Sequence, residues 1–359
     1  MKKKICIFCG ENPIDKNKEH IIPQWLIQMT DKSGRKTVIG TNHKGDKLTI
    51  PWNKFVFPSC EVCNTNFGKL EAKVKNIVLN LLEEKQVSHG QMDLFLDWLD
   101  KVRTGLWLGQ LIHKKIDIDP HFHINQRVAE KDRVCLIYKI DDIEKGINIT
   151  GTEFPIFHLI PSCFSLTINH LCFFSYSKEF ILSENLGFPF PSKYNLLDDG
   201  RMAVEEFKIG HSKVSDRILE GTILKPSIRF YQSILTGEHW LQKPRIGRSA
   251  KFYKNNCFTF IKNKIKSRIY IANDYDGVVM FWPFKKNFRF SGQQQVHREL
   301  LENFVAKMVL EHQIQCAQQH FDKSESELIK GFEELIEVNR KSLDKIDNIL
   351  KQVVPEYYK

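Results

Sequence analysis

Three short stretches near the N-terminus decide how this chain begins to fold: Cys6-Ile7-Phe8-Cys9, Glu19-His20-Ile21-Ile22-Pro23 and Cys60-Glu61-Val62-Cys63-Asn64. Two C-x-x-C pairs therefore bracket an acid–histidine pair, and an amide residue directly follows the second C-x-x-C pair. Two such pairs in a chain that otherwise uses cysteine sparsely are typical of four thiolates on one tetrahedral zinc. The sequence thus predicts a structural zinc bound by Cys6, Cys9, Cys60 and Cys63.

The remaining cysteines predict no disulfide framework. The chain has nine cysteines, and the five outside the two pairs are Cys135, Cys163, Cys172, Cys257 and Cys316. Their scattered spacing is typical of small buried side chains in a reducing compartment. We therefore expect a cytoplasmic protein.

The chain of 359 residues is long enough for two or three domains and a sizeable hydrophobic core. It has no apolar run near the ~20 residues of a membrane-spanning helix. Met1-Lys2-Lys3-Lys4 leads into Cys6 rather than into an apolar stretch with a cleavage site. We therefore expect neither a membrane span nor a secretion signal.

Changes in residue pattern divide the chain into four segments. Residues 1–85 form the cysteine-bearing module, and residues 86–126 form a helical connector. Residues 127–290 consist of short β-branched and aromatic runs broken by Gly, Pro, Asn and Asp, which predicts a mainly β domain for recognition or sensing. Residues 291–359 return to a helical pattern. The sequence therefore predicts an α+β fold.

Apolar residues at helical spacing predict two helices on either side of residue 85. The first begins near Cys60-Cys63, and its apolar face comprises Phe67, Leu70, Val74, Ile77, Val78 and Leu81. The second runs from about Met92 to Lys115, and its buried side comprises Leu94, Trp98, Leu99, Val102, Leu106 and Leu111. Together they could seat the cysteine-bearing module on the rest of the chain.

The C-terminal segment carries a heptad pattern. Its apolar seam, with spacings of three and four, comprises Ile329, Phe332, Ile336, Asn339, Leu343, Ile346, Leu350 and Val353. One interpretation is a coiled-coil contact with a second copy or a partner protein, in which Asn339 selects register or oligomeric state. The other is a helix folded back on its own domain. About three heptads do not decide between them.

The formal net charge of +10 favours an anionic partner. Nearly all of the excess lies in residues 243–268, a stretch without Asp or Glu whose cations are Lys243, Arg245, Arg248, Lys251, Lys254, Lys262, Lys264, Lys266 and Arg268. Aromatic residues such as Tyr253 and Phe258 are interleaved with them, which is typical of nucleic-acid-binding surfaces. The alternative is a solvated strand face whose aromatic side chains point to the core.

The N-terminal arrangement resembles the HNH endonucleases, the zinc-stapled branch of the ββα-metal (His-Me finger) nucleases. The resemblance covers about the first 75 residues and rests on the four cysteines, the Glu19-His20-x-x-Pro23 string and Asn64, in the family's order. It implies that Glu19 and Asn64 bind the catalytic metal and that His20 is the general base.

The chemistry of these side chains agrees with that implication. Phosphodiester hydrolysis needs a base that activates water and a cation that neutralises charge on the phosphate. Histidine is the side chain best suited to accept a proton at neutral pH, as His20 would. The oxygens of Glu19 and Asn64 are hard ligands that suit Mg²⁺ or Mn²⁺ rather than zinc. We therefore expect two separate sites, one for structural Zn²⁺ and one for catalytic Mg²⁺ or Mn²⁺.

Two positions depart from the family's pattern. Asn64 stands where the family often has His, and Phe55 stands where the family's middle Asn is usual. Asn53 is the nearest candidate for that structural role, and Asn66 or Glu71 could also support the site. The nuclease prediction therefore depends on the acid–histidine pair and on Asn64.

The resemblance implies a metal-dependent endonuclease that acts on DNA. An HNH module joined to a long unrelated segment further suggests a restriction or phage-defence effector. The alternative is a non-catalytic, zinc-containing DNA-binding or regulatory protein that keeps the same fold.

Overall fold

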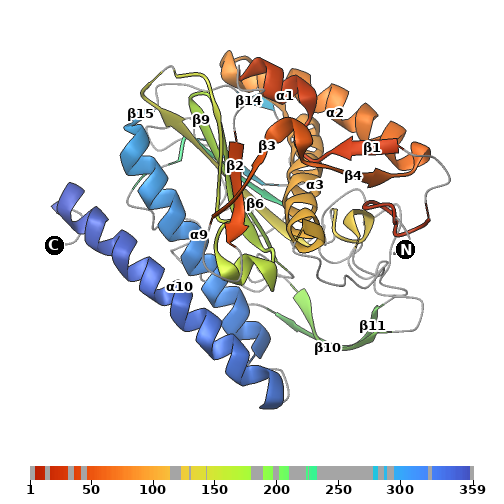
Figure 1. The fold of residues 1–359 in the computed structure, drawn as a ribbon, viewed down its shortest axis with the longest axis vertical. Helices are drawn as coiled ribbons and strands as arrows, with labels where there is room; N and C mark the ends of the chain where they lie inside the picture. The colour runs from red at the N-terminus through yellow and green to blue at the C-terminus, as the bar shows by residue number, and fades with distance from the viewer. Residues whose placement is uncertain are drawn as a thin grey trace.

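A computed structural model describes most of the chain. The described residues are 5–12, 17–30, 36–41, 47–113, 123–128, 131–142, 144–178, 189–196, 202–209, 224, 226–232, 278–281, 287–288, 295–321 and 326–355. Helices and strands are mixed in these ranges around a curled sheet, which confirms the predicted α+β class (Figure 1). No helix in these ranges has the length and apolar character needed to cross a bilayer.

The N-terminal elements follow a strand–strand–helix path. In chain order they are β1 (Asn17–His20), α1 (Gln24–Met29), β2 (Lys36–Thr41), β3 (Lys47–Pro51), η1 (Trp52–Lys54), β4 (Val56–Ser59) and α2 (Glu61–Leu82). β1 and β4 pair antiparallel, so His20 at the end of β1 lies opposite Val56 at the start of β4. β2 and β3 form a separate antiparallel hairpin between them. Cys60 alone separates β4 from α2.

The largest sheet of the described residues has seven strands in the order β13-β12-β6-β9-β8-β7, with β15 paired to β6. These strands are β6 (Asp132–Ile140), β7 (Ile147–Thr150), β8 (Cys163–Ile168), β9 (Leu171–Lys178), β12 (Ile228–Gln232), β13 (Val278–Phe281) and β15 (Gln295–Val296). The β12–β13 and β6–β15 pairs are parallel, and the other pairs are antiparallel. Outside this sheet, β10 (Pro189–Leu196) pairs with β11 (Met202–Ile209), and β5 (Val87–Ser88) pairs with β14 (Asn287–Phe288).

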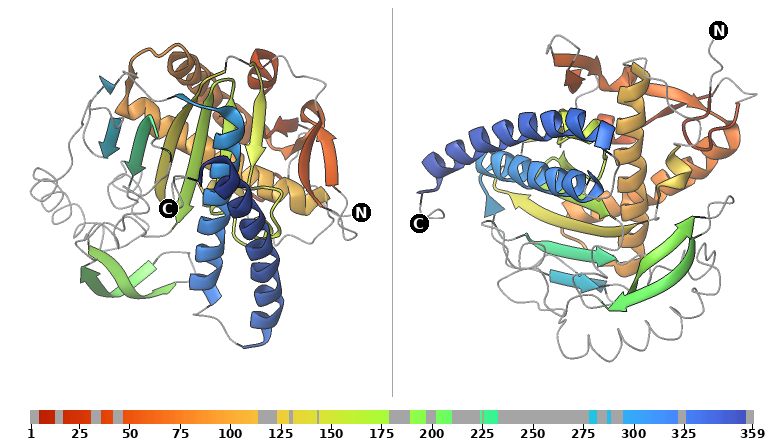
Figure 2. Two further views of the ribbon diagram at one scale, coloured as in Figure 1. Left: turned by 90° about the vertical axis from the view of Figure 1, so that its left-hand side faces the viewer. Right: turned by 90° about the horizontal axis from the view of Figure 1, so that it is seen from below.

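Helices cover both faces of this sheet (Figure 2). Side chains of a strand alternate between its two faces. Accordingly, Cys135 and Ile137 of β6 join the core that contains α3 (His89–His113), whereas Leu136 and Tyr138 join the core that contains α9 (Arg298–Phe321). β6 is therefore buried along almost its whole length.

The described elements change in kind along the chain. Those between residues 127 and 290 are mainly strands, and α9 and α10 (Ser326–Val353) follow within residues 291–359. β15 (Gln295–Val296) is a strand inside the segment predicted to be helical. Its two residues pair with β6, so the strand depends on a distant partner that local pattern does not reveal.

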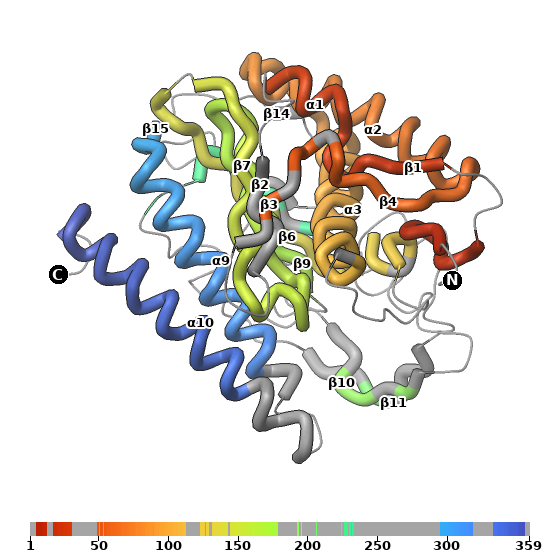
Figure 3. Tube along the Cα trace, in the orientation of Figure 1, coloured from red at the N-terminus to blue at the C-terminus, as the bar shows by residue number. Residues whose placement is uncertain are grey.

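The C-terminal heptad seam is used within the chain, because α10 runs back along α9 (Figure 3). Ile336 and Leu343 pack in a cluster with Ile156 of η3 (Pro155–His158) and with α9. Ile346 and Leu350 join the core between α9 and the sheet. The structure thus shows the helix folded back on its own domain, while Val353, at the end of the seam, is 53% exposed.

The N-terminal module shares one continuous core with α3 and the sheet. Ile21, Phe55 and Phe57 belong to the same buried cluster as Trp98 of α3 and Phe173 of β9. Phe55 is fully buried and packs edge to face on Phe57, with ring centroids 4.9 Å apart. The residue at the family's middle-Asn position is therefore a core side chain at the contact with α3.

Gly109→Ala on α3 is expected to destabilise the protein, although alanine normally favours a helix. An added Cβ would lie 2.5 Å from Cζ of Phe57 and 2.7 Å from Cζ of Phe55, two buried rings. Overpacking of this kind costs about 1–3 kcal/mol, which outweighs the gain of ~1 kcal/mol in helix propensity.

Gly68→Ala on α2 is the matched control for Gly109→Ala. No atom lies within 4 Å of a Cβ added there, so it should stabilise the protein by up to ~1 kcal/mol. Urea denaturation measures both free energies of unfolding. A stabilising Gly109→Ala substitution would contradict the close approach of α3 to the two rings.

Candidate functional site

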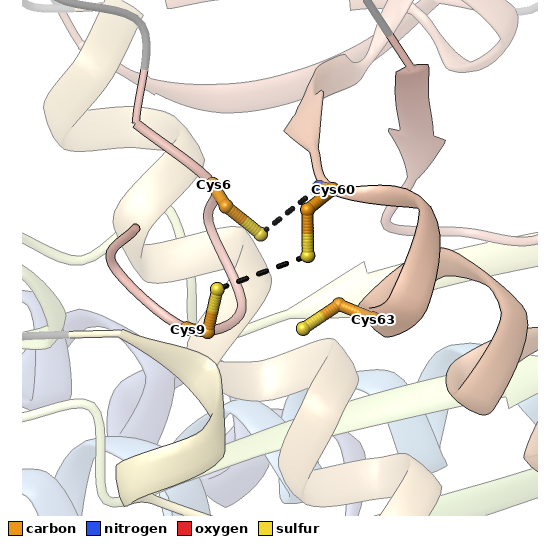
Figure 4. A group of neighbouring side chains, drawn as sticks. All are labelled: Cys6, Cys9, Cys60 and Cys63. Atoms are coloured by element: carbon orange, nitrogen blue, oxygen red, sulfur yellow. Dashed lines mark hydrogen bonds between the residues drawn. The ribbon is translucent and has the colours of Figure 1, made fainter. Parts of the chain in front are cut away.

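Four cysteines converge at the start of the chain (Figure 4). Their sulfur atoms all lie within 4.8 Å of one another, and Cys9 Sγ is 3.9 Å from Cys60 Sγ. Four thiolates at ~2.3 Å from a shared tetrahedral ion would be about 3.8 Å apart. All four are free cysteines, so no disulfide competes for the sulfur atoms. As predicted from their spacing, these residues could hold one metal ion.

Two turns from distant parts of the chain present these sulfur atoms. Cys6 and Cys9 flank a turn that Gly10 closes by donating its N–H to the Cys6 carbonyl, at 2.9 Å and with a φ of 78° at the glycine. Cys60 caps the N-terminus of α2, and Cys63 lies in its first turn. The Cys60 N–H donates to Cys6 Sγ at 3.2 Å, which joins the two turns directly.

Burial and hydrogen bonds shift the pKa values of three of the four thiols. Burial raises the pKa of the Cys9 thiol to about 11 and also raises the pKa of Cys63. Burial acts in the same direction on Cys60, but hydrogen bonds from the Cys63 backbone and from neighbouring thiols lower the pKa of Cys60. A coordinated metal ion deprotonates its thiol ligands outright. A cation bound at this cluster would therefore have to displace the protons that burial favours on Cys9 and Cys63.

Glu19 is buried in an ion-pair cluster. Only 7% of the residue is exposed, and its Oε1 accepts a hydrogen bond of 2.8 Å from Lys101 Nζ on α3. Lys101 is fully buried and also pairs with Glu71 Oε1 of α2. Burial raises the pKa of Glu71, and the Lys101 ammonium opposes that rise. The cluster thus joins two carboxylates and one ammonium from three different elements.

His20 follows Glu19 as the last residue of β1. Its imidazole is partly exposed, whereas Glu19 is buried. Its Nε2 is 3.4 Å from Gln24 Nε2, at the first residue of α1. The amide nitrogen can only donate, so His20 Nε2 is the acceptor in this long contact.

Asn64 lies partly exposed in the first turn of α2, directly after Cys63. Its N–H donates to the Cys60 carbonyl at 3.0 Å. Within the ranges given above, no hydrogen bond or ion pair joins the side chains of Glu19, His20 and Asn64. The α2 residue that reaches Glu19 is Glu71, through Lys101. Seven residues, or about 10 Å along the helix, separate Asn64 from Glu71.

Lys101 was not identified from the sequence, although a signal for it exists. It stands three residues after Trp98 on the predicted apolar side of the second helix, where an unpaired lysine would be costly. A lysine in such a position needs buried acidic partners. The sequence offers many acids, and only the three-dimensional arrangement selects Glu19 and Glu71.

Several predicted site residues lie outside the described part of the chain. They are the nine cations of the basic stretch, Lys243, Arg245, Arg248, Lys251, Lys254, Lys262, Lys264, Lys266 and Arg268. Of the three candidates for a supporting role, Asn66 is exposed, Glu71 joins the ion-pair cluster, and the side chain of Asn53 is not described.

Comparisons with protein-family models, curated proteins and solved structures found no match. The functional interpretation therefore depends on the residue pattern of the N-terminal module and on its geometry.

Proposed function

We propose that this protein is a metal-dependent HNH endonuclease that hydrolyses DNA phosphodiester bonds. The observation that carries the proposal is the β1–β4–α2 path, in which His20 ends one strand and Asn64 lies in the first turn of the helix. The four-cysteine site joins the two ends of this path through the Cys60–Cys6 contact. A short strand pair backed by one helix is the frame that the HNH resemblance implies.

The metal at the four cysteines is proposed to be structural Zn²⁺. Four thiolates form the soft ligand set that zinc prefers, and a site with four protein ligands leaves no open position for chemistry. The ion would tie residues 6–9 to the start of α2. Its contribution is therefore to the stability of the frame rather than to catalysis.

His20 is proposed to act as the general base. Its Nε2 already acts as an acceptor toward Gln24, and the ring is partly exposed, so this nitrogen can take the proton of an attacking water. The distance of 3.4 Å between His20 Nε2 and Gln24 Nε2 is long for a hydrogen bond, so a water molecule can replace the Gln24 amide at little cost.

Glu19 and Asn64 are proposed to hold Mg²⁺ or Mn²⁺. Lys101 bonds Oε1 of Glu19, which leaves Oε2 as the ligand atom, and Asn64 would contribute its side-chain oxygen. Both are hard oxygen donors of the kind these ions take. A divalent ion bound there would neutralise charge on the phosphate during cleavage. The protein's own contribution is to hold the Glu19 carboxylate in a single orientation.

DNA is the proposed substrate because of the HNH resemblance and the net charge of +10. The basic stretch at residues 243–268 is proposed to neutralise the phosphates of the DNA. The proposed biological role is that of a restriction or phage-defence effector in the cytoplasm. The C-terminal helix keeps an exposed side that is available to a partner protein or a second copy.

His20→Ala is expected to lower the rate of plasmid DNA cleavage in Mg²⁺ or Mn²⁺ by about 10²–10⁴-fold, because a positioned general base contributes that much. The matched control is His297→Ala, an exposed histidine next to α9 that should cleave at the wild-type rate. Circular dichroism and metal content verify that both variants fold.

A non-catalytic zinc-containing DNA-binding or regulatory protein is the second candidate. It is favoured by one observation, that Glu19 is only 7% exposed and its carboxylate is already paired with a buried ammonium. Under this alternative, wild type and His20→Ala would both bind DNA and both leave it uncut. That result would remove the nuclease proposal and retain the zinc fold.

A further inference from the structure

Lys101 Nζ lies in a cage of four oxygen atoms. Glu19 Oε1 is at 2.8 Å, the carbonyl oxygens of His20 and Ile21 are at 3.1 and 3.4 Å, and Glu71 Oε1 completes the set. Two of these oxygens come from the end of β1, one from Ile21 directly after it, and one from α2. The ammonium has no exposed surface, so the cage holds it away from solvent.

The oxygens of this ligand set are also of the kind that hold a divalent cation. Two carboxylates and two backbone carbonyls are the donors that Ca²⁺ commonly takes in proteins. The ammonium has only three N–H donors for four acceptors, and its single charge leaves one of the two carboxylate charges uncompensated. A cation of charge +2 would neutralise both Glu19 and Glu71.

The cage is also joined to the four-cysteine site. The ring of Phe8, which stands between Cys6 and Cys9, has its centroid 5.9 Å from Lys101 Nζ. Phe8 stacks in turn on Phe67 of α2, with centroids 4.2 Å apart. The turn that carries two of the thiols therefore covers one side of the cage and keeps water from it.

We infer that Lys101 is a positioning residue that excludes divalent ions from this buried cage and so confines a bound ion to the outer side of Glu19, on the side where solvent and substrate have access. The inference deepens the proposed function, on which it rests for the identity of the outer ion. While the ammonium occupies the cage, Oε2 is the only Glu19 oxygen left to bind the outer ion. That ion cannot enter the space between Glu19 and Glu71. The lysine thus replaces a second metal ion by a covalently attached charge.

The test removes the ammonium and asks whether the cage accepts a metal ion. Lys101→Ala leaves two buried carboxylates and space for an ion. We expect this variant to bind Ca²⁺ in calorimetry and to gain about 4 °C in melting temperature at ~100 times the dissociation constant. The wild type should show no gain of that size. The experiment is made in a His20→Ala background, so cleavage activity does not enter the readout.

A second variant controls for the origin of the Ca²⁺ response. Lys101→Ala/Glu71→Gln keeps the cavity but removes one carboxylate, so the response should fall to the wild-type level. Three results would each overturn the inference: no Ca²⁺ response in Lys101→Ala, an undiminished response in the double variant, or failure of Lys101→Ala to fold in Ca²⁺ as well as without it.

The two proposals can fail separately. If wild type does not cleave DNA but Lys101→Ala gains a Ca²⁺ site, the exclusion of a divalent ion stands and the nuclease assignment falls. If wild type cleaves DNA but Lys101→Ala gains no site, the nuclease assignment stands and Lys101 is a partner of two structural carboxylates only.

Discussion

Cys9→Ser is expected to lose most of the metal at the four-cysteine site and to unfold the N-terminal elements. Structural Zn²⁺ contributes about 10–16 kcal/mol of apparent binding free energy in small zinc modules, which matches or exceeds the ~5–15 kcal/mol stability of a typical domain. Cys9 is the suitable choice because it is only partly buried, so the substitution removes a ligand with little change to the core.

The unfolding should be local in its first stage. Without the ion, the turn at residues 6–9 is held to the rest of the module by hydrogen bonds such as Ile7 N–H to the Pro58 carbonyl at 3.0 Å and Cys60 N–H to Cys6 Sγ at 3.2 Å. Hydrogen exchange should therefore accelerate first in residues 5–12 and 56–63. Elemental analysis measures the metal content, and addition of a chelator to the wild type should reproduce the same exchange pattern.

Cys172→Ala is the control for the loss of a cysteine. Cys172 is 3% exposed in β9 and lies on the α9 side of the sheet, away from the four thiols. Its replacement should cost about 1–2 kcal/mol and leave the metal content unchanged. If Cys9→Ser keeps a full equivalent of metal, or if both variants melt alike, the four cysteines do not form one structural site.

Arg133→Met is expected to lower the free energy of unfolding by about 3 kcal/mol, because Asp97 loses its cation while Asp100 keeps only Arg103. Arg133 is 4% exposed, and its Nη1 lies 2.5 Å from Asp97 and 3.3 Å from Asp100. Burial lowers the pKa of the Arg133 guanidinium, but the nearby carboxylates of Asp97 and Asp100 have the larger effect and raise it. Its Nε also donates to Gln232 of β12, so this side chain links α3 to the sheet.

Arg103→Met is the matched control, since it removes a second buried arginine from the same helix. Arg103 Nη2 bonds Asp100 at 2.7 Å, but among the described residues its Nε and Nη1 have no hydrogen-bond partner. The substitution removes two unsatisfied donors and leaves Asp100 paired with Arg133, so the loss should be at most about 1–2 kcal/mol. Equal losses in urea denaturation would contradict this division of the network.

Local periodicity predicted the helices well. Val74, Ile77, Val78 and Leu81 of α2 are buried, as the apolar spacing indicated, and the second helix buries Trp98, Leu99 and Val102. The predicted limits of about residues 92 and 115 compare with His89–His113. A helix face is visible in a sequence because the residues that share it are three or four positions apart.

Strand pairing could not be predicted in the same way. Phe230 of β12 pairs with Cys135 of β6, and Gln295 of β15 pairs with Lys139. These partners are separated by long stretches of chain, so no local pattern records which strands become neighbours. The sequence indicated strands between residues 127 and 290 but not that several of them join one sheet covered on both faces.

The sequence by itself determined the four-cysteine cluster and the local elements of this protein. Two C-x-x-C pairs specify four thiolates at short range, and the structure confirms that their sulfur atoms meet within 4.8 Å. The placement of Asn64 after the second pair also follows directly from the order of residues.

Only the tertiary structure decided what surrounds the acid–histidine pair. Glu19 and Lys101 are 82 positions apart, and their contact exists because a buried ammonium must find carboxylates wherever packing brings them. The same applies to Phe55, whose site opposite Gly109 depends on the approach of α3. Backbone periodicity is a property of neighbouring residues, whereas compensation of buried charge and filling of volume are properties of the assembled core.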